Sequence, residues 1–216
     1  MKNFARITGT GSYLPSKIIT NFDLEKTLDT SDEWITARTG IKERRIVTNE
    51  STCDLAIEAS LNALSMSEIS PQDIDLIILA TTTPDKIFPA TATMLQDRLG
   101  ASCPAFDLQA VCAGFVFALS TAQQYIENGS AKNILVVGSE TMSKIVDWSD
   151  RSTAILFADG AGAVVLSADN YTGIKHSKIY SDGSYLSSLH VNNNGIDELG
   201  TIEMEGNDVG VCHKEL

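Results

Sequence analysis

Hydrophobic positions along the chain alternate between short continuous runs and helical stripes. The run Ile74–Ala80 is almost wholly apolar and lies between Pro71 and Pro84, which predicts a strand buried on both faces. Two later runs, Ile134–Val137 and Ala163–Leu166, predict buried strands for the same reason.

Two helical patterns lie among these strands. The first, Ser51–Ser65, begins with hydroxyl and carboxyl side chains suited to capping, and the second, Ala113–Glu127, ends at Asn128 and Gly129. The positions predicted to face the core are Cys53, Ile57, Leu61 and Leu64 in the first helix and Phe115, Leu119, Ala122 and Ile126 in the second. This alternation of strands and helices favours an α/β fold with a largely parallel, covered sheet.

Glycine-rich and polar segments mark the turns. Ser167–Gly173 and Asp182–Gly200 are rich in Asn, Asp, Ser and Gly, which predicts turns and long loops. The Gly9-x-Gly11 pair is not followed by a helix, so it fails as a dinucleotide fingerprint. Gly160-x-Gly162 runs directly into a strand and predicts a tight turn or a bulge.

Composition narrows the class of protein. The 216 residues carry a formal net charge of −12 and are 43% hydrophobic, which suits a globular domain and disfavours nucleic-acid binding. No apolar run has the roughly 18 residues that span a bilayer, and no apolar segment follows the N-terminus as in a secretory signal.

The cysteines lie far apart without a CxxC pair: Cys53, Cys103, Cys112 and Cys212. We therefore expect a cytoplasmic protein with neither disulfides nor a metal site. The histidines are each expected to face solvent: His176, His190 and His213.

Cys112 stands where a predicted strand gives way to a predicted helix. The strand is expected to run to about Val111 and the helix to begin just after Cys112. Helix N-terminal amides and the helix dipole favour a thiolate, which is the form a cysteine nucleophile needs. Ala113 and Gly114 leave room for a substrate carbonyl, and the Cys112 amide could donate to an oxyanion. The alternative is a small buried hydrophobic residue, which is what most cysteines are.

A second group of residues combines an aromatic ring with cations. Thr30 and Glu33 are spaced as a capping box, and the helix they open would place Trp34 and Arg38 on one face. Four of the 16 cations fall within residues 38–45. An indole beside guanidinium groups suits an adenine ring and its phosphates. The alternative is a solvated surface cluster with a half-buried tryptophan.

Several blocks of sequence are specific in combination, although no single one is specific by itself. They are GTGSYLP, TSDEWITARTGIKERR, DLIILATTTPD, FPATA, PAFDLQAVCAGF, LVVGSE, DRSTAILFADGAGAVVL and the weaker DGSYLSSL and MEGND. Together they closely resemble the β-ketoacyl-[acyl-carrier-protein] synthase III family of the thiolase superfamily. The fold implied is a thiolase-like layered α/β fold, with the first repeat complete and the second truncated.

The resemblance implies an activity and a set of site residues. A short acyl group, expected to be acetyl, would pass from coenzyme A to Cys112, and decarboxylating condensation with malonyl-acyl carrier protein would then initiate fatty acid synthesis. Coenzyme A carries the substrate, so no resident cofactor is implied. Trp34 and Arg151 would sandwich the adenine, and Phe88 would close the acyl pocket of a partner subunit across a homodimer interface. The further residues implied at the coenzyme A site are Thr30, Arg38, Leu156, Met204, Gly206 and Asn207.

The same resemblance divides the chain into residues 1–170, the half with the nucleophile, and 171–216, a linker with the truncated start of a second half. In the family, that second half carries a catalytic histidine in an H-Q-A-N-like motif and a catalytic asparagine in a G-N-T-S-like motif, and neither motif occurs here. The alternatives are therefore an acyltransferase, an inactive fragment that keeps dimerisation and partial coenzyme A surface, or one part of a split enzyme. Truncation is expected to uncover apolar surface around Phe115, Leu119 and Ile126.

Overall fold

The computed structural model describes residues 3–193 and 199–205, and the chain forms two compact units that alternate along the sequence. Unit 1 consists of Met1–Pro15, Thr48–Glu140 and Gly160–Ile179, and unit 2 of Ser16–Val47, Thr141–Asp159 and Tyr180–Leu216. This division describes contacts in space. The split into 1–170 and 171–216 concerns related halves of the sequence and stays a prediction.

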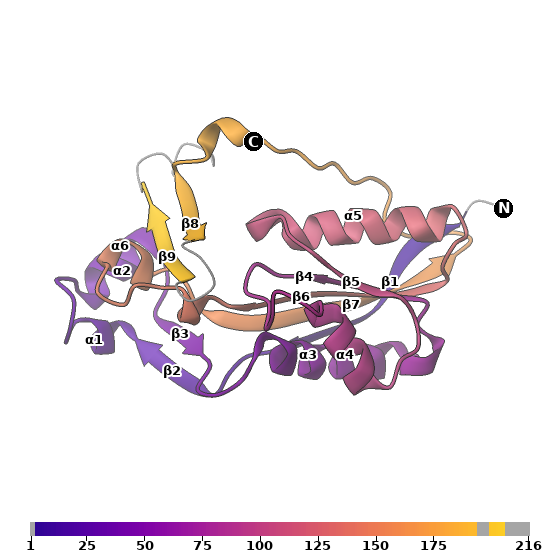
Figure 1. Ribbon diagram of the computed structural model, residues 1–216, viewed down its shortest axis with the longest axis horizontal. Coiled ribbons are helices and arrows are strands. Elements are labelled where there is room, and N and C mark those ends of the chain that lie inside the picture. The colour runs from indigo at the N-terminus through magenta and orange to yellow at the C-terminus, as the bar shows by residue number, and fades with distance from the viewer. Residues whose placement is uncertain (1–2, 194–198, 206–216) are drawn as a thin grey trace. The chain divides into compact units, whose positions relative to one another are not determined.

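Unit 1 is built on a five-stranded sheet with the order β1-β7-β6-β4-β5 (Figure 1). Its strands are β1 (Phe4–Tyr13), β4 (Leu76–Ala80), β5 (Ala105–Leu108), β6 (Asn133–Thr141) and β7 (Asp159–Asp169). The expectation of parallel pairing is confirmed where β4 pairs with β5 and β6. It is wrong at the other edge, where β1 and β7 are antiparallel. That pairing keeps Gly160 and Gly162 inside β7, so the turn or bulge predicted there is wrong.

Helices cover both faces of this sheet (Figure 1). They are α3 (Thr52–Ser67) and α4 (Thr91–Leu99) on one face and α5 (Gly114–Glu127) on the other, with the short 3₁₀ turn η1 (Pro71–Asp73) before β4. Every residue of β4 is buried, as the continuous apolar run predicts. Ile78 packs in the core beneath α5, and strand alternation directs Ile77 and Leu79 to the opposite face.

The helix α3 lies unusually close to β1. A Cβ built on Gly9 would lie 2.2 Å from the Ala63 carbonyl oxygen, and one on Gly11 would lie 2.2 Å from that of Ala59. Only glycine permits this approach. The predicted caps of α3 are confirmed, since Ser51 and Asp54 form a capping box. Of the positions predicted to face the core, Leu61 is 46% exposed and Ile57 is only partly buried, so neither belongs to the buried face. That face comprises Thr52, Cys53, Leu55, Ala56, Ala59, Ser60, Ala63 and Leu64.

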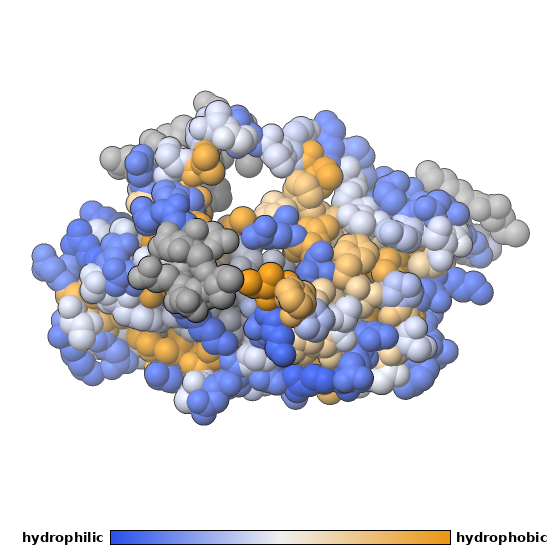
Figure 2. All heavy atoms as spheres, viewed as in Figure 1, coloured by the Kyte–Doolittle hydropathy of each residue, from blue (hydrophilic) through white to orange (hydrophobic). Residues whose placement is uncertain are grey.

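The inner face of α5 packs against the core of unit 1. Ile126 is fully buried, so the prediction that it is uncovered is wrong. Phe115 and Leu119 pack against the same core but are only partly buried, so the prediction of uncovered apolar surface holds in part at these two residues. Their partners are the sheet residues of unit 1 itself. Apolar side chains that do reach the surface along α5 are Val116 and Tyr125, and Figure 2 shows apolar residues interspersed with polar ones over this region.

Unit 2 combines short elements around its own apolar cluster. Its elements are β2 (Lys17–Thr20), α1 (Asn21–Leu24), α2 (Asp32–Thr39), β3 (Glu43–Ile46), η3 (Met142–Lys144), α6 (Arg151–Ala154), η4 (Gly183–Tyr185), β8 (Leu189–Asn193) and β9 (Leu199–Met204). The strands form two antiparallel pairs, β2–β3 and β8–β9. Long loops were predicted over Asp182–Gly200, and the β8–β9 pair corrects that prediction. Ile35, Ala154 and Ile202 are among the buried residues of the cluster.

Candidate active site

Cys112 lies in the 3₁₀ turn η2 (Val111–Ala113), between β5 and α5. The strand ends at Leu108, three residues earlier than predicted, because Val111 takes a left-handed φ of 47° that no strand accommodates. A β-branched residue in that conformation is strained, and such strain collects at functional sites. The Cys112 residue is exposed, and α5 begins two residues later, as the nucleophile interpretation requires. No described residue accepts a hydrogen bond from its amide.

Packing fixes the turn that carries Cys112. A Cβ on Gly114 would lie 3.2 Å from the Ala80 Cβ, so the start of α5 sits directly on the end of β4. The Thr81 amide donates to the Leu108 carbonyl oxygen at 3.2 Å, which ties the segment after β4 to the end of β5. These two contacts therefore fix the position of the Cys112 turn relative to the ends of β4 and β5.

Glu140, near the end of β6, holds the segment after β4. Its carboxylate accepts hydrogen bonds from the backbone amides of Thr82 at 2.8 Å and Thr83 at 3.1 Å. The hydroxyls of Thr81, Thr82 and Thr83 donate to the same carboxylate at 3.3, 2.8 and 2.5 Å. A carboxylate satisfied by several donors makes a rigid local support. The sequence analysis did not predict the hydrogen bonds to Glu140, because nothing in a Thr-Thr-Thr segment indicates which residue accepts from its amides and hydroxyls.

The other cysteines have different surroundings. Cys53 is fully buried as predicted, and burial raises the pKa of its thiol. It also lies in the first turn of α3, where its amide donates to Asp85, so Cys112 is not unique in adjoining a helix N-terminus. Cys103 is half-buried, and burial likewise raises its pKa. Cys212 lies outside the described residues.

Unit 2 brings three of the predicted binding residues together. The guanidinium carbon of Arg38 lies 4.2 Å from the Trp34 ring centroid, and that of Arg151 lies 4.8 Å from it. Trp34 and Arg38 thus share one helix face as predicted, and Trp34 lies within stacking distance of Arg151 although the two are 117 positions apart in the sequence. The adenine sandwich between Trp34 and Arg151 stays a prediction. Arg151 also donates to the Asp29 carbonyl oxygen at 2.8 Å. The three side chains define the indole–guanidinium cluster, a name we keep below.

The helix that carries Trp34 begins one residue later than predicted. Its N-cap is Ser31, whose hydroxyl accepts from the Trp34 amide at 3.1 Å, so the predicted capping box of Thr30 and Glu33 is wrong. With Ser31 as the N-cap, the third helical position is Trp34, which has no carboxylate to accept a hydrogen bond from the N-cap amide. The Thr30 hydroxyl oxygen is buried and has no hydrogen-bond partner among the described residues. Buried polar atoms ordinarily form a hydrogen bond, so this hydroxyl has hydrogen-bonding capacity that the described residues do not use.

The remaining predicted site residues are distributed as follows. Leu156 is partly buried against the apolar cluster of unit 2, and Met204 is half-buried at the end of β9. Phe88 is 83% exposed, in the segment between β4 and α4. Gly206 and Asn207 lie outside the described residues.

Two histidines can be placed. His176 is exposed as predicted. His190 is not simply solvent-facing: its Nε2 lies 3.6 Å from a Glu203 carboxylate oxygen, and its buried Nδ1 has no partner among the described residues. His213 lies outside the described residues.

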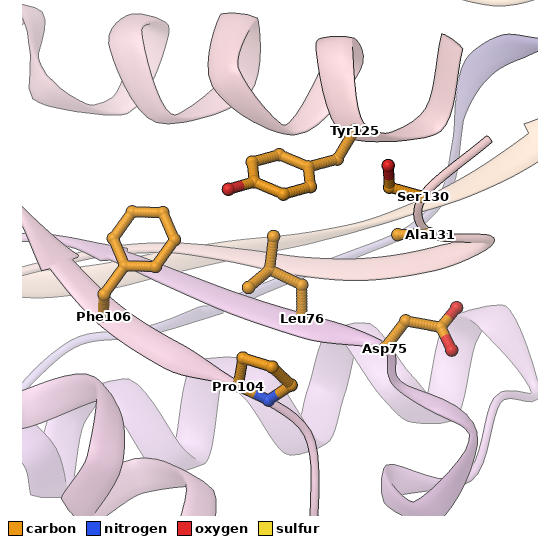
Figure 3. A pocket seen from close by; sticks show the side chains of 7 residues that line it. All are labelled: Asp75, Leu76, Pro104, Phe106, Tyr125, Ser130 and Ala131. Atoms are coloured by element: carbon orange, nitrogen blue, oxygen red, sulfur yellow. The ribbon is translucent and has the colours of Figure 1, made fainter. Parts of the chain in front are cut away.

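A small cavity of about 250 Å³ opens at the opposite ends of β4 and β5 from Cys112. Figure 3 shows the Tyr125 ring extending from α5 toward the sheet, with Phe106 and Leu76 facing it. Its other lining residues are Asp75, Pro104, Ser130 and Ala131. Because it lies at the amino ends of the parallel strands, it is separate from the Cys112 turn.

Over residues 3–193 and 199–205, no cluster of three or more His, Cys, Asp or Glu side chains could hold a metal ion. Within the same ranges, no helix combines the length and apolar character needed to cross a membrane.

The layered sheet with helices on both faces defines the chain as a thiolase-like α/β protein. The crystal structure of 3-oxoacyl-[acyl-carrier-protein] synthase III from Aquifex aeolicus VF5 matches it with a TM-score of 0.91 and 48% identity, covering 96% of this chain and 67% of that one. The corresponding synthase III structure from Pseudomonas aeruginosa PAO1 matches with a TM-score of 0.88 and 38% identity, covering 95% and 65%.

Sequence comparison identifies the family to which the chain belongs within this fold class. A family model described as 3-Oxoacyl-[acyl-carrier-protein (ACP)] synthase III matches residues 106–183. Beta-ketoacyl-[acyl-carrier-protein] synthase III of Vesicomyosocius okutanii is 68% identical over 209 residues, which are 97% of this chain and 67% of the relative. The Neisseria gonorrhoeae protein of the same name is 60% identical over 87% of this chain and 60% of the relative. The chain belongs to the β-ketoacyl-[acyl-carrier-protein] synthase III family, and it spans about two thirds of the length of these relatives.

Proposed function

We propose that this chain supplies the acyl-accepting and nucleotide-binding parts of a condensing enzyme that joins a short acyl group, acetyl being the expected one, to malonyl-acyl carrier protein at the start of fatty acid synthesis. The observation that carries the proposal is the indole–guanidinium cluster. An aromatic plane with two guanidinium groups at 4.2 and 4.8 Å suits an adenine ring with its phosphates. The buried, unpartnered Thr30 hydroxyl adds a polar group with capacity for a ligand.

In the first proposed step, the Cys112 sulfur attacks the thioester carbonyl carbon of acyl-coenzyme A. The bond from that carbon to the coenzyme A sulfur breaks, and coenzyme A leaves as a thiolate that takes up a proton. Cys112 lies two residues before α5, a helix of 14 residues whose N-terminal end favours negative charge. The Cys112 amide, free of described acceptors, is our candidate donor to the oxyanion.

In the second proposed step, malonyl-acyl carrier protein loses CO₂, and the resulting carbanion attacks the acyl group on Cys112. The carbon–sulfur bond to Cys112 breaks, which releases the β-ketoacyl product and restores the thiolate. Charge develops on the malonyl thioester oxygen in this step. The family resemblance assigns its stabilisation to histidine and asparagine motifs that the 216 residues do not contain. We therefore propose acylation for this chain and expect little condensation from it alone.

The proposal includes a cytoplasmic location and a homodimer in which exposed Phe88 reaches a partner subunit's acyl pocket. We assign Leu156 and Met204 to the pantetheine path, together with Gly206 and Asn207.

The test is intact-mass spectrometry of the purified chain after incubation with acetyl-coenzyme A. One acetyl group on Cys112, absent from Cys112→Ser, is the expected result. Trp34→Ala should raise the half-saturating concentration about tenfold, since stacking of a base on an aromatic side chain contributes about 1–3 kcal/mol. Trp148→Phe is the matched control, because that indole donates to the Ser143 carbonyl oxygen and lies outside the cluster.

The competing candidate is an inactive fragment, favoured by the share of its relatives that the chain spans. Adding malonyl-acyl carrier protein separates the two. An acetyl-enzyme without product supports our proposal, whereas no acetyl-enzyme at any concentration supports the inactive fragment. Full turnover to β-ketoacyl product would contradict the division of labour that we propose.

A further inference from the structure

Arg44, on β3, is a buried cation. Only 2% of its surface is exposed, which makes it one of the largest fully buried side chains in the described structure. Its Nε and Nη2 both donate to the Ile155 carbonyl oxygen, at 3.0 and 2.6 Å, and its Nη1 donates to the Asn21 Oδ1 at 2.6 Å. Both acceptors are uncharged. The cations of residues 38–45 therefore do not form one phosphate-binding surface, because Arg44 is withdrawn into the interior.

Such burial is unfavourable in isolation. Desolvation lowers the pKa of the Arg44 guanidinium, and Arg44 makes no ion pair with any described residue. An apolar side chain of similar volume would avoid the desolvation of a charge. The hydrogen-bonded geometry is what distinguishes Arg44 from such a side chain.

That geometry joins the two helices that carry the indole–guanidinium cluster. On one side, Asn21 accepts from Arg44 and donates through Nδ2 to the Asp32 carboxylate at 2.8 Å, at the start of α2. On the other side, Ile155 is the residue that ends α6. Trp34 and Arg38 lie on α2, and Arg151 begins α6.

Both helices need support from outside themselves. The α2 helix has eight residues and α6 has four, and helices this short are marginal without tertiary contacts. The Asn21 side chain also donates to the Ile41 carbonyl oxygen at 2.8 Å, so the connection reaches the segment that follows α2. Arg44 and Asn21 thus tie the beginning of α2 and its exit to the end of α6.

We propose that Arg44 is a positioning residue for nucleotide recognition: by bonding Asn21 and Ile155 at once, it sets the separation of Trp34 from Arg151. The inference rests on the proposed function, because it assumes that the cluster binds the nucleotide part of the acyl donor. The planar guanidinium fork is essential, since two donors converge on one carbonyl while a third points to Asn21. A lysine ammonium is a single point and cannot make this arrangement.

The experiment compares two acetyl donors, acetyl-coenzyme A and the nucleotide-free acetyl-N-acetylcysteamine thioester. The variants are Arg44→Lys, which keeps the charge, and Arg44→Met, which keeps the bulk. Lys17→Met is the matched control, because it removes an exposed cation from the neighbouring strand β2. Acetylation of Cys112 is followed by intact mass, and circular dichroism checks the fold.

We expect both Arg44 variants to raise the half-saturating concentration of acetyl-coenzyme A by about tenfold, equivalent to about 1.4 kcal/mol. The rate with the nucleotide-free thioester should stay at the wild-type value, and Lys17→Met should change neither. Equal losses with both donors, or failure of both variants to fold, would overturn the proposal by assigning Arg44 to stability alone. If the Arg44 variants prefer acetyl-coenzyme A over the nucleotide-free thioester as strongly as the wild type does, the proposal is also overturned, whereas the proposed function stands. A wild-type chain that does not discriminate between the donors would instead refute the proposed function, and this inference with it.

Discussion

Replacing Gly11 with alanine tests the close contact between β1 and α3. The added Cβ would lie 2.2 Å from the Ala59 carbonyl oxygen and 2.4 Å from the Ala63 amide nitrogen. Both atoms belong to the backbone of a 16-residue helix, so neither can rotate away as a side chain would. The helix as a whole must shift, or the strand must bend.

The magnitude follows from these distances. Close carbon–oxygen contacts in proteins are about 3.3–3.6 Å, so the helix would have to retreat by about 1 Å. Overpacking of this kind costs about 1–3 kcal/mol. Alanine also restricts the unfolded chain, which offsets about 0.4–1 kcal/mol of that loss. Taking the centre of each range, the free energy of unfolding should therefore fall by about 1.3 kcal/mol, and the melting temperature by about 3–5 °C for a chain of this size.

The assay is thermal unfolding followed by circular dichroism, with urea unfolding as a second measurement. Gly183→Ala is the matched control, because no atom beyond its chain neighbours lies within 4 Å of its Cβ position. Gly9→Ala should resemble Gly11→Ala, since its Cβ meets the Ala63 carbonyl oxygen at 2.2 Å. If Gly11→Ala melts with the wild type and with the control, the helix does not rest on the strand as we argue.

Three further outcomes are expected. Iodoacetamide should alkylate exposed Cys112 before buried Cys53, whose pKa is raised by burial; peptide mass spectrometry that finds the reverse order would contradict the site. Glu140→Gln should lower the free energy of unfolding by about 1–3 kcal/mol, because its amide would face N–H donors, and urea titration measures the loss. Backbone hydrogen bonds from Tyr171 and the residue after it hold the pKa of Asp169 below its ordinary value of 3.8. Its stabilisation is therefore complete above pH 3.8 and is lost as the pH falls through the lowered pKa, so the melting-temperature difference between wild type and Asp169→Asn should vanish in acid. A difference that persists unchanged in acid would contradict that assignment.

Local signals in the sequence predicted the elements whose causes are local. The apolar run of β4 and the capping residues at the start of α3 are patterns in neighbouring residues, and both predictions are confirmed. The end of α5 is also local, since Gly129 takes a left-handed φ of 80° just after Asn128. Each depends on a few neighbouring residues, so no knowledge of the tertiary fold was needed.

Elements stabilised by distant partners were missed. The strand β8 lies within the predicted loop and has the largely polar sequence LHVNN, yet it pairs with β9, where the Ile202 amide also donates to the Ile145 carbonyl oxygen at 2.9 Å. Gly160 and Gly162 suggested a turn, but pairing with β1 holds Gly162 opposite Ser12 in an extended ladder. Tertiary hydrogen bonds outweighed local preference in both cases.

The candidate site divides in the same way. Cys112 could be found from its place between a strand and a helix, which is a local pattern. The contact of Trp34 with Arg151 was predicted only through family resemblance, because no periodicity relates residues so far apart. The roles of Arg44 and Glu140 were predicted by neither approach. A charged residue is ordinarily exposed, and nothing local indicates that Arg44 is buried or that Glu140 accepts hydrogen bonds from the segment after β4.

The distance along the chain between Trp34 and Arg151 follows from how unit 2 is assembled. Its first segment, Ser16–Val47, is inserted between β1 and α3, and its second, Thr141–Asp159, lies between the strands β6 and β7. Trp34 belongs to the first segment and Arg151 to the second, so neither insertion can form the cluster alone. The binding group that we propose is made from two insertions, so it needs a bond that holds them together as well as the side chains that would contact the ligand. Arg44 belongs to the first segment and donates twice to a carbonyl of the second, which is why we assign the cost of a buried cation to the assembly of this site.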